Sequence, residues 1–199
     1  AGALKLESTV ESELNVNDDP GVVILLIGLG NLLLGDEGVG IHVLRRLERD
    51  YRLEPAVTLI DGGTLGLDLL PLFAEHRRIL MIDAIALDAP PGRIAVFRDA
   101  DIRHALSPKL SVHHLGVSDL LALLQLLDDG PTEIVLVGIV PECLELGLDL
   151  SPSVAAAIPD VIERVGEILS AWDIALGAST SQSRTPGLSA SASSAASRA

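Results

Sequence analysis

Short aliphatic runs alternate with longer segments of helical period along the middle of this chain. Several of the runs are apolar at every position, which is typical of strands in a sheet that is covered on both faces. On this pattern we predict five strands, at residues 22–27, 57–60, 79–82, 94–97 and 134–140. The longer segments predict helices at residues 37–50, 66–74, 115–127 and 153–171.

The alternation of strands and helices favours an α/β fold. Strands that are joined by helical crossovers run parallel, and the helices cover both faces of their sheet. Start signals support two of the helices, Ser118-Asp119 near one and Ser151-Pro152 at the other. The connection 83–94 contains Pro90-Pro91-Gly92, which is typical of a tight loop and allows one strand to break the parallel pattern. We therefore predict a mainly parallel sheet sandwiched between helices.

The two ends of the chain differ from its middle in composition. Residues 1–20 are polar and acidic, and residues 176–199 are mostly Ser and Ala. Such segments bury too little apolar surface to offset the entropy of ordering them, so we expect both to be mobile. A chain of 199 residues with 48% hydrophobic content can bury one sizeable core, which we expect to form a single domain over residues 21–175.

Composition and charge exclude several classes of function. The formal net charge of -14 disfavours a nucleic-acid partner, and the aromatic share of 2% provides no platform for stacked bases. The single cysteine excludes an internal disulfide and a Cys-rich metal site, and fits a reducing compartment. Because no apolar run approaches the roughly 18 residues of a membrane helix, we expect a soluble, cytoplasmic protein with no membrane partner.

Acidic residues follow three of the predicted strands. The run at 22–27 leads through a glycine-rich turn to Asp36-Glu37, the run at 57–60 ends at Asp61, and the run at 79–82 ends at Asp83. In open parallel sheets, ligands bind beyond the carboxyl ends of the strands. These carboxylates should therefore lie on the same edge of the sheet.

Each of these acids also has a purely structural interpretation. Asp36 precedes an apolar periodic segment and is a plausible helix N-cap. Asp83 is harder to explain in this way, because a carboxylate beside a buried strand needs a partner or a metal. The pair His113-His114 lies just before a predicted helix, either as a solvated loop feature or with one ring aimed at the sheet edge. With Glu37 and Asp83, one imidazole makes an open-sided site for a divalent metal such as nickel or zinc.

Two nucleotide-binding motifs fail on inspection. Gly28-Leu29-Gly30 begins like a dinucleotide fingerprint, but the third glycine would fall at Leu33. A phosphate-binding P-loop needs a lysine after its last glycine, whereas Gly35 is followed by Asp36, which would repel a phosphate. A nucleotide-binding α/β domain is therefore a weak alternative.

Taken together, the motifs from about residue 22 to residue 170 resemble those of the NiFe-hydrogenase maturation endopeptidases. The motifs are Gly28-x-Gly30-Asn31-x-Leu33-x-x-Asp36-Glu37-x-x-Gly40, Asp61-Gly62-Gly63-Thr64-x-Gly66, Asp83-Ala84, Pro91-Gly92, Ser111-x-His113-x-Leu115-Gly116 and Gly138-x-x-Pro141-Glu142. The resemblance implies a twisted, mostly parallel five-stranded sheet between helices. It also implies a metal-binding triad of Glu37, Asp83 and His113.

The resemblance further implies an activity, the removal of the C-terminal extension of a hydrogenase large-subunit precursor once nickel is installed. Nickel in the precursor would then be the element that the protease recognises. Two mechanisms stay open: the metal activates the scissile carbonyl or a water, or it only docks the substrate while Asp36 or Asp61 acts as general base. A role for Asp61 in orienting its glycine turn ranks slightly ahead. The non-enzymatic alternative is a maturation chaperone that binds the precursor tail.

Overall fold

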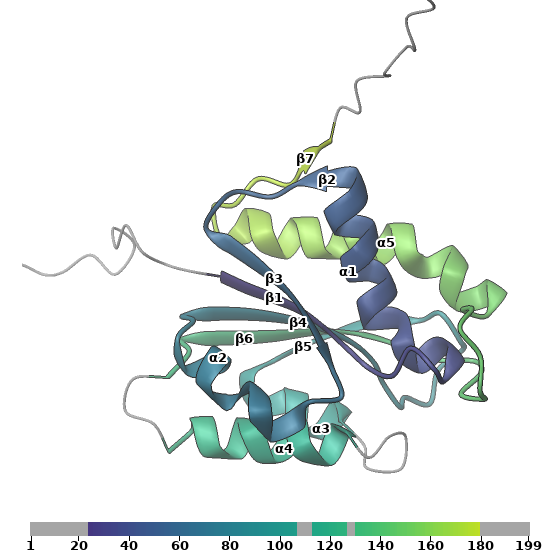
Figure 1. Ribbon diagram of the computed structural model, residues 1–199, viewed down its shortest axis with the longest axis horizontal. Helices are drawn as coiled ribbons and strands as arrows, with labels where there is room; N and C mark the ends of the chain where they lie inside the picture. The colour runs from purple at the N-terminus through teal and green to yellow at the C-terminus, as the bar shows by residue number, and fades with distance from the viewer. Residues whose placement is uncertain (1–23, 107–112, 127–129, 180–199) are drawn as a thin grey trace, which may run out of the picture.

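The computed structural model describes residues 24–106, 113–126 and 130–179, and a five-stranded sheet forms its centre. The strand order is β3-β1-β4-β6-β5. Neighbouring strands are parallel except for β5, which runs antiparallel to β6 (Figure 1). The strands are β1 (Ile24–Leu29), β3 (Val57–Gly63), β4 (Arg78–Ala84), β5 (Ile94–Arg98) and β6 (Glu133–Ile139). The structure confirms the predicted α/β class, the five strands and the antiparallel exception.

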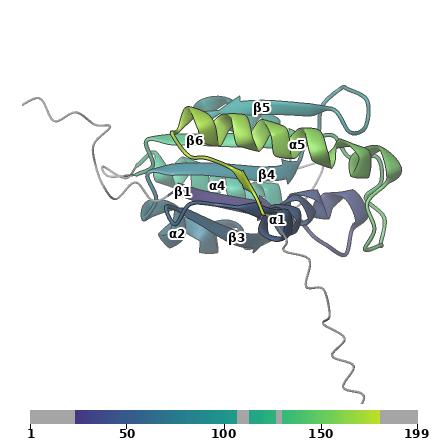
Figure 2. The ribbon, with the colours of Figure 1, turned by 90° about the horizontal axis from the view of Figure 1, so that it is seen from above.

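Helices cover both faces of the sheet. One face carries α1 (Val39–Asp50) and α5 (Pro152–Ala171), and the other carries α2 (Leu70–Ala74), α3 (Ile102–Ala105) and α4 (His113–Leu124), as Figures 1 and 2 show. Short 3-10 turns precede three of these helices, namely η1 (Gly35–Gly38), η2 (Gly66–Leu69) and η3 (Asp99–Asp101). The sheet is therefore enclosed between two helical layers, as predicted.

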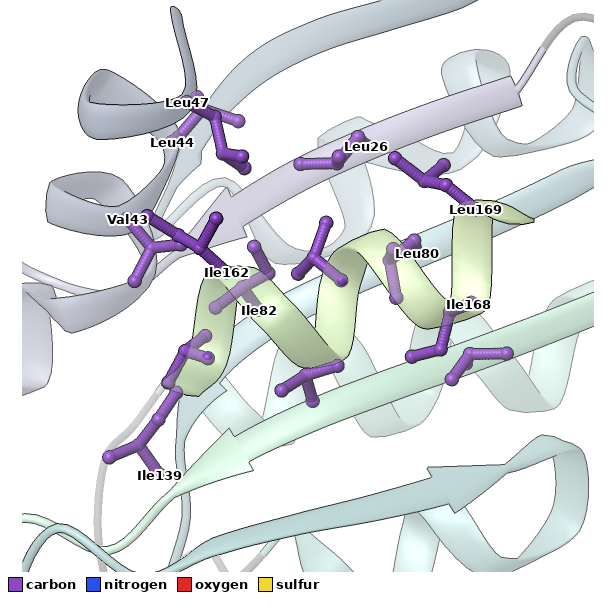
Figure 3. Close-up of a cluster of buried hydrophobic side chains, with 14 of the residues drawn as sticks. Leu26, Val43, Leu44, Leu47, Leu80, Ile82, Ile139, Ile162, Ile168 and Leu169 are labelled. Carbon is purple, nitrogen blue, oxygen red and sulfur yellow. The ribbon is translucent and has the colours of Figure 1, made fainter. Parts of the chain in front are cut away.

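The strands are apolar at successive positions because each face of the sheet has its own core. Leu26 points to the layer of α1 and α5, whereas its neighbours Leu25 and Ile27 point to the layer of α2, α3 and α4. Figure 3 shows the first of these cores, in which α5 packs across side chains of α1 and of the central strands. Burying one such aliphatic side chain is worth about 1.5–3 kcal/mol, so both cores stabilise the sheet strongly.

Several short elements differ from the sequence prediction. The strands β2 (Tyr51–Arg52) and β7 (Gly177–Ala178) pair antiparallel and were not among the predicted strands. Helix α4 begins at His113, which places Ser118-Asp119 inside the helix rather than at its start. Ser151 does cap α5, where its side chain accepts the Val154 N–H at 3.4 Å. Among the described residues, no helix has the length and apolar character needed to cross a membrane.

Candidate functional site

The glycine-rich turn after β1 brings the chain back against the end of its own strand. Gly30 has a φ of +116°, which side chains disfavour, and a Cβ there would lie 1.7 Å from the Glu37 carbonyl oxygen. Its N–H donates to the Gly63 carbonyl at 2.9 Å, which joins this turn to the end of β3. Only glycine fits this position, and the close approach sets η1 at the carboxyl edge of the sheet.

A second glycine sets the start of α1 directly on the sheet. A Cβ on Gly40 would lie 2.2 Å from the Ile82 carbonyl oxygen of β4 and 2.5 Å from that of Leu29. The 3-10 turn η1, which immediately precedes α1, packs against β4 as well. Asp83 is the second-last residue of β4. Glu37 lies in η1, the element that packs against this strand.

Asp83 is completely buried at this edge, and contacts are present at both of its carboxylate oxygens. Oδ1 accepts the Ala84 N–H at 2.8 Å, and Oδ2 lies 3.3 Å from Nε2 of His114. His114 is also completely buried, in the first turn of α4. The sequence indicated that Asp83 needs a partner, and the structure supplies one in the imidazole of His114.

The predicted metal ligands come from three different elements. Glu37 is only 2% exposed and Asp83 is fully buried, so both carboxylates face the protein interior. His113 is the first residue of α4, and its side chain lies outside the part of the chain that the structure describes. Within the described part, no three His, Cys, Asp or Glu side chains form a group that could hold a metal ion. The triad of Glu37, Asp83 and His113 therefore stays a prediction.

The carboxylate of Asp36 binds the loop after β6. Its carboxylate accepts the backbone N–H groups of Glu142, Cys143 and Ser151 at 2.7–2.9 Å. Burial by itself raises the pKa of Asp36, but these backbone hydrogen bonds outweigh it and hold the pKa below its ordinary value. The N-cap interpretation is wrong, because Asp36 caps no helix. The carboxylate instead joins the turn after β1 to a loop more than 100 residues away.

Replacing Asp36 by asparagine is expected to lower the free energy of unfolding by about 2–4 kcal/mol, because an amide cannot accept all three buried N–H groups. The folded-state pKa is lowered, so the stability supplied by Asp36 is present above about pH 4 and is lost as the pH falls through the folded pKa. Urea unfolding between about pH 2 and pH 7, followed by the fluorescence of the single tryptophan, measures both effects.

The exposed Asp68→Asn variant is the control, and it should change stability by less than about 0.5 kcal/mol. An Asp36→Asn protein that keeps the wild-type stability and the wild-type slope below about pH 4 would contradict the role assigned to these hydrogen bonds.

Asp61 occupies the rim of the site, where its side chain is 48% exposed. Its Oδ1 accepts the Gly63 N–H at 3.2 Å, and its Oδ2 lies 4.0 Å from the guanidinium of Arg45. The hydrogen bond closes the turn at Gly63, where φ is +47°. This geometry supports the orienting role that the sequence favoured for Asp61. The four predicted acids therefore share one edge of the sheet, with Glu37 and Asp83 buried and Asp61 in solvent.

Comparison with known proteins identifies the family. Residues 41–168 match the model of the hydrogenase maturation protease family. The hydrogenase 2 maturation protease of Escherichia coli is 37% identical over 143 residues, which cover 71% of this chain and 87% of that protein. The chain belongs to this family. The resemblance noted in the sequence is therefore confirmed, and the chain is a hydrogenase maturation protease by descent.

Solved structures of the family have the same fold. The hydrogenase-maturating endopeptidase of E. coli superposes with a TM-score of 0.75 at 34% identity, over 78% of this chain and 97% of that one. The NiFe hydrogenase maturation protease of Thermococcus kodakarensis superposes with a TM-score of 0.58 at 31% identity, over 73% and 97% of the two chains. The five-stranded sheet between two helical layers is thus the architecture of the maturation proteases.

One residue of this maturation protease, His114, has a place at the site that the sequence did not single out. The strand-end argument left His113 and His114 open, and the resemblance pointed to His113. The buried side of α4 carries Val117, Leu120 and Leu124, and one helical turn before Val117 this stripe reaches position 114. A helix predicted to begin two residues earlier would have placed His114 on its buried face.

Proposed function

We propose that this protease removes the C-terminal extension of a NiFe-hydrogenase large-subunit precursor. The observation that carries the proposal is the pair of buried carboxylates, Glu37 and Asp83, at the open edge of the sheet in a chain of the hydrogenase maturation protease family. Two buried acidic side chains at the carboxyl edge of a parallel sheet, where such folds bind their ligands, support a binding role.

We further propose that nickel carried by the precursor binds to Glu37, Asp83 and His113. Two carboxylates and an imidazole suit a borderline divalent metal, and three protein ligands leave positions free for the ligands of the substrate itself. The two close glycine contacts support this arrangement, because they hold η1 against β4 and so bring Glu37 to the edge that Asp83 occupies. Nickel is then part of the substrate, and the protease recognises the precursor by binding this metal.

His114 has a positioning role in this proposal. Its Nε2 lies beside Oδ2 of Asp83, while the Ala84 N–H binds Oδ1, so the carboxylate is held from two sides. A carboxylate fixed in this way presents one orientation to a metal, as partners outside the ligand set commonly do in metal sites. We propose that His113 is a ligand of the nickel and that His114 orients Asp83.

Peptide hydrolysis also needs a water molecule and a base. The hydrogen bonds on Asp36 occupy its oxygens and lower its pKa, which makes it a poor proton acceptor. Asp61 is exposed, and its Oδ2 lies 4.0 Å from the Arg45 guanidinium, which is beyond hydrogen-bond distance. We propose that Asp36 supports the site, that nickel docks the scissile peptide, and that Asp61 is the carboxylate with access to an attacking water.

A direct test separates the protease from a maturation chaperone. Purified protein is incubated with a nickel-loaded large-subunit precursor, and the intact mass of the precursor is measured over time. We expect the mass to fall by that of the C-terminal extension, while a large subunit that already lacks the extension keeps its mass. A stable complex with a precursor of unchanged mass would instead favour the chaperone.

A further inference from the structure

Exposed leucines gather in the loops at the edge of the sheet that holds the site. Within the described residues, nine large hydrophobic side chains are exposed, and six of them are leucines in the segments that follow β1, β3, β4 and β6. They are Leu33, Leu65, Leu67, Leu87, Leu146 and Leu148, which we call the leucine rim. Single exposed leucines are common, but a gathering of them around one edge is typical of a surface that binds protein.

Backbone hydrogen bonds join the four loops into one continuous edge. The loop after β1 bonds to that after β6, where the N–H of Gly147 donates to the Leu33 carbonyl at 3.0 Å. The loop after β4 is tied to the same segment, since the Gly92 N–H donates to the Val140 carbonyl at 2.8 Å. With the Gly30–Gly63 bond between the first two loops, backbone hydrogen bonds connect all four segments that carry the rim.

The same loops carry a strong excess of negative charge. Six exposed acidic residues lie in residues 61–69, 85–93 and 140–151, against one exposed basic residue, Arg93. The acids are Asp61, Asp68, Asp88, Glu142, Glu145 and Asp149. A surface of this kind attracts positive charge during encounter and repels another acidic surface. Because the chain itself has a net charge of -14, charge complementarity disfavours a second copy of it as the partner.

We propose that the leucine rim is the docking surface for the large-subunit precursor, and that it binds a segment of the precursor in which apolar and basic side chains are mixed. The segments that carry the leucines follow strands that end at the same edge as Glu37 and Asp83, so the position of the leucines favours the substrate as the occupant. This inference rests on the proposed function and deepens it. Recognition then has two parts, nickel at the carboxylates and an apolar, basic segment at the rim.

The first test removes apolar surface from the rim without changing charge. The double variant Leu33→Gln/Leu146→Gln is compared with Leu123→Gln/Leu126→Gln, which alters two leucines that are 41% and 78% exposed in and just after α4. Burial of one leucine supplies enough free energy for about a tenfold change in affinity or more, so we expect KM for the precursor to rise at least about tenfold in the rim variant. The α4 variant should keep the wild-type KM.

The second test changes charge instead of apolar surface. Glu145→Lys on the rim is compared with Glu163→Lys, which makes the same change on the exposed face of α5. We expect the rim variant to raise KM about threefold or more at low salt, and the difference to shrink between about 50 and 500 mM KCl because salt screens exposed charges. The α5 variant should follow the wild type throughout.

The outcomes separate the rim from the proposed function. If the wild type shortens the precursor and the rim variants match their controls in KM, the rim proposal is overturned and the proposed function stands. If the wild type leaves the precursor intact, the proposed function fails, and binding of the uncut precursor to the same variants still tests the rim. A rim variant that turns a dimer into a monomer with unchanged KM would make the rim a contact between copies and overturn the proposal.

Discussion

Asp83→Asn is expected to abolish shortening of the large-subunit precursor while leaving the fold intact. The asparagine oxygen can still accept the Ala84 N–H at the place of Oδ1, so the local backbone keeps its hydrogen bond. The neutral amide, however, is a poor ligand for a divalent cation and carries no charge toward it. Removing a residue that only supports a metal ligand lowers metal affinity or activity roughly 10–100-fold. Removing a direct ligand should lower the rate of shortening by more than this.

Rates of shortening are measured by intact mass under single-turnover conditions, and the fold is checked by thermal unfolding. Glu37→Gln should behave like Asp83→Asn, since it removes the other buried carboxylate. His114→Gln should reduce the rate by only about 10–100-fold, because it disturbs the orientation of Asp83 and removes no ligand. Asp160→Asn, on the exposed face of α5, is the matched control and should keep the wild-type rate. Wild-type processing by Asp83→Asn would remove this residue from the site.

The pattern of apolar residues predicted the sheet because these strands are buried on both faces. Each described residue of β1 is buried, so the strand is apolar without interruption until the glycine turn, and the end of the run marks the carboxyl edge. The pairs β2 and β7 have only two residues each, and α3 has four. Elements of that length contain about one period of either pattern and no repeat of it, so they could not be predicted in this way.

The candidate site was predictable to the extent that it depends on strand ends. Asp61 and Asp83 follow apolar runs, and the parallel register brings both to the edge that the turn before Glu37 also reaches. The role of Asp36 was not predictable, because its partners are backbone N–H groups of residues 142, 143 and 151. A backbone donor has no signature in the sequence, and only the folded loop after β6 brings these three together.

The same distinction applies to the leucine rim. Its members are spread between positions 33 and 148 and follow no helical or strand period, so they look like scattered loop residues in the sequence. They become one surface only because four loops follow strands that end at one edge. Sequence periodicity reports how elements bury their faces, whereas docking surfaces on loops depend on topology.

A precursor without nickel is expected to remain uncut by the wild-type protease. In the proposed site, two carboxylates carry negative charge that a substrate without a cation does not neutralise, and such a precursor has no metal for them to bind. Nickel in the precursor supplies the opposite charge and fixes the scissile peptide beside the site. The expected reduction in rate is on the order of 100-fold or more, comparable with the loss of a ligand.

The experiment compares one precursor preparation before and after nickel loading, with intact mass as the measure of cleavage. Zinc loading of the same precursor tests whether any divalent cation suffices. Binding of both precursor forms to the protease is measured in parallel, because the rim should still hold the nickel-free form through its apolar and basic contacts. Binding without cleavage would show that docking and metal recognition are separate steps. Efficient cleavage of the nickel-free precursor would mean that cleavage does not depend on nickel binding to Glu37 and Asp83. The proposed recognition of the precursor through its nickel would then have to be abandoned.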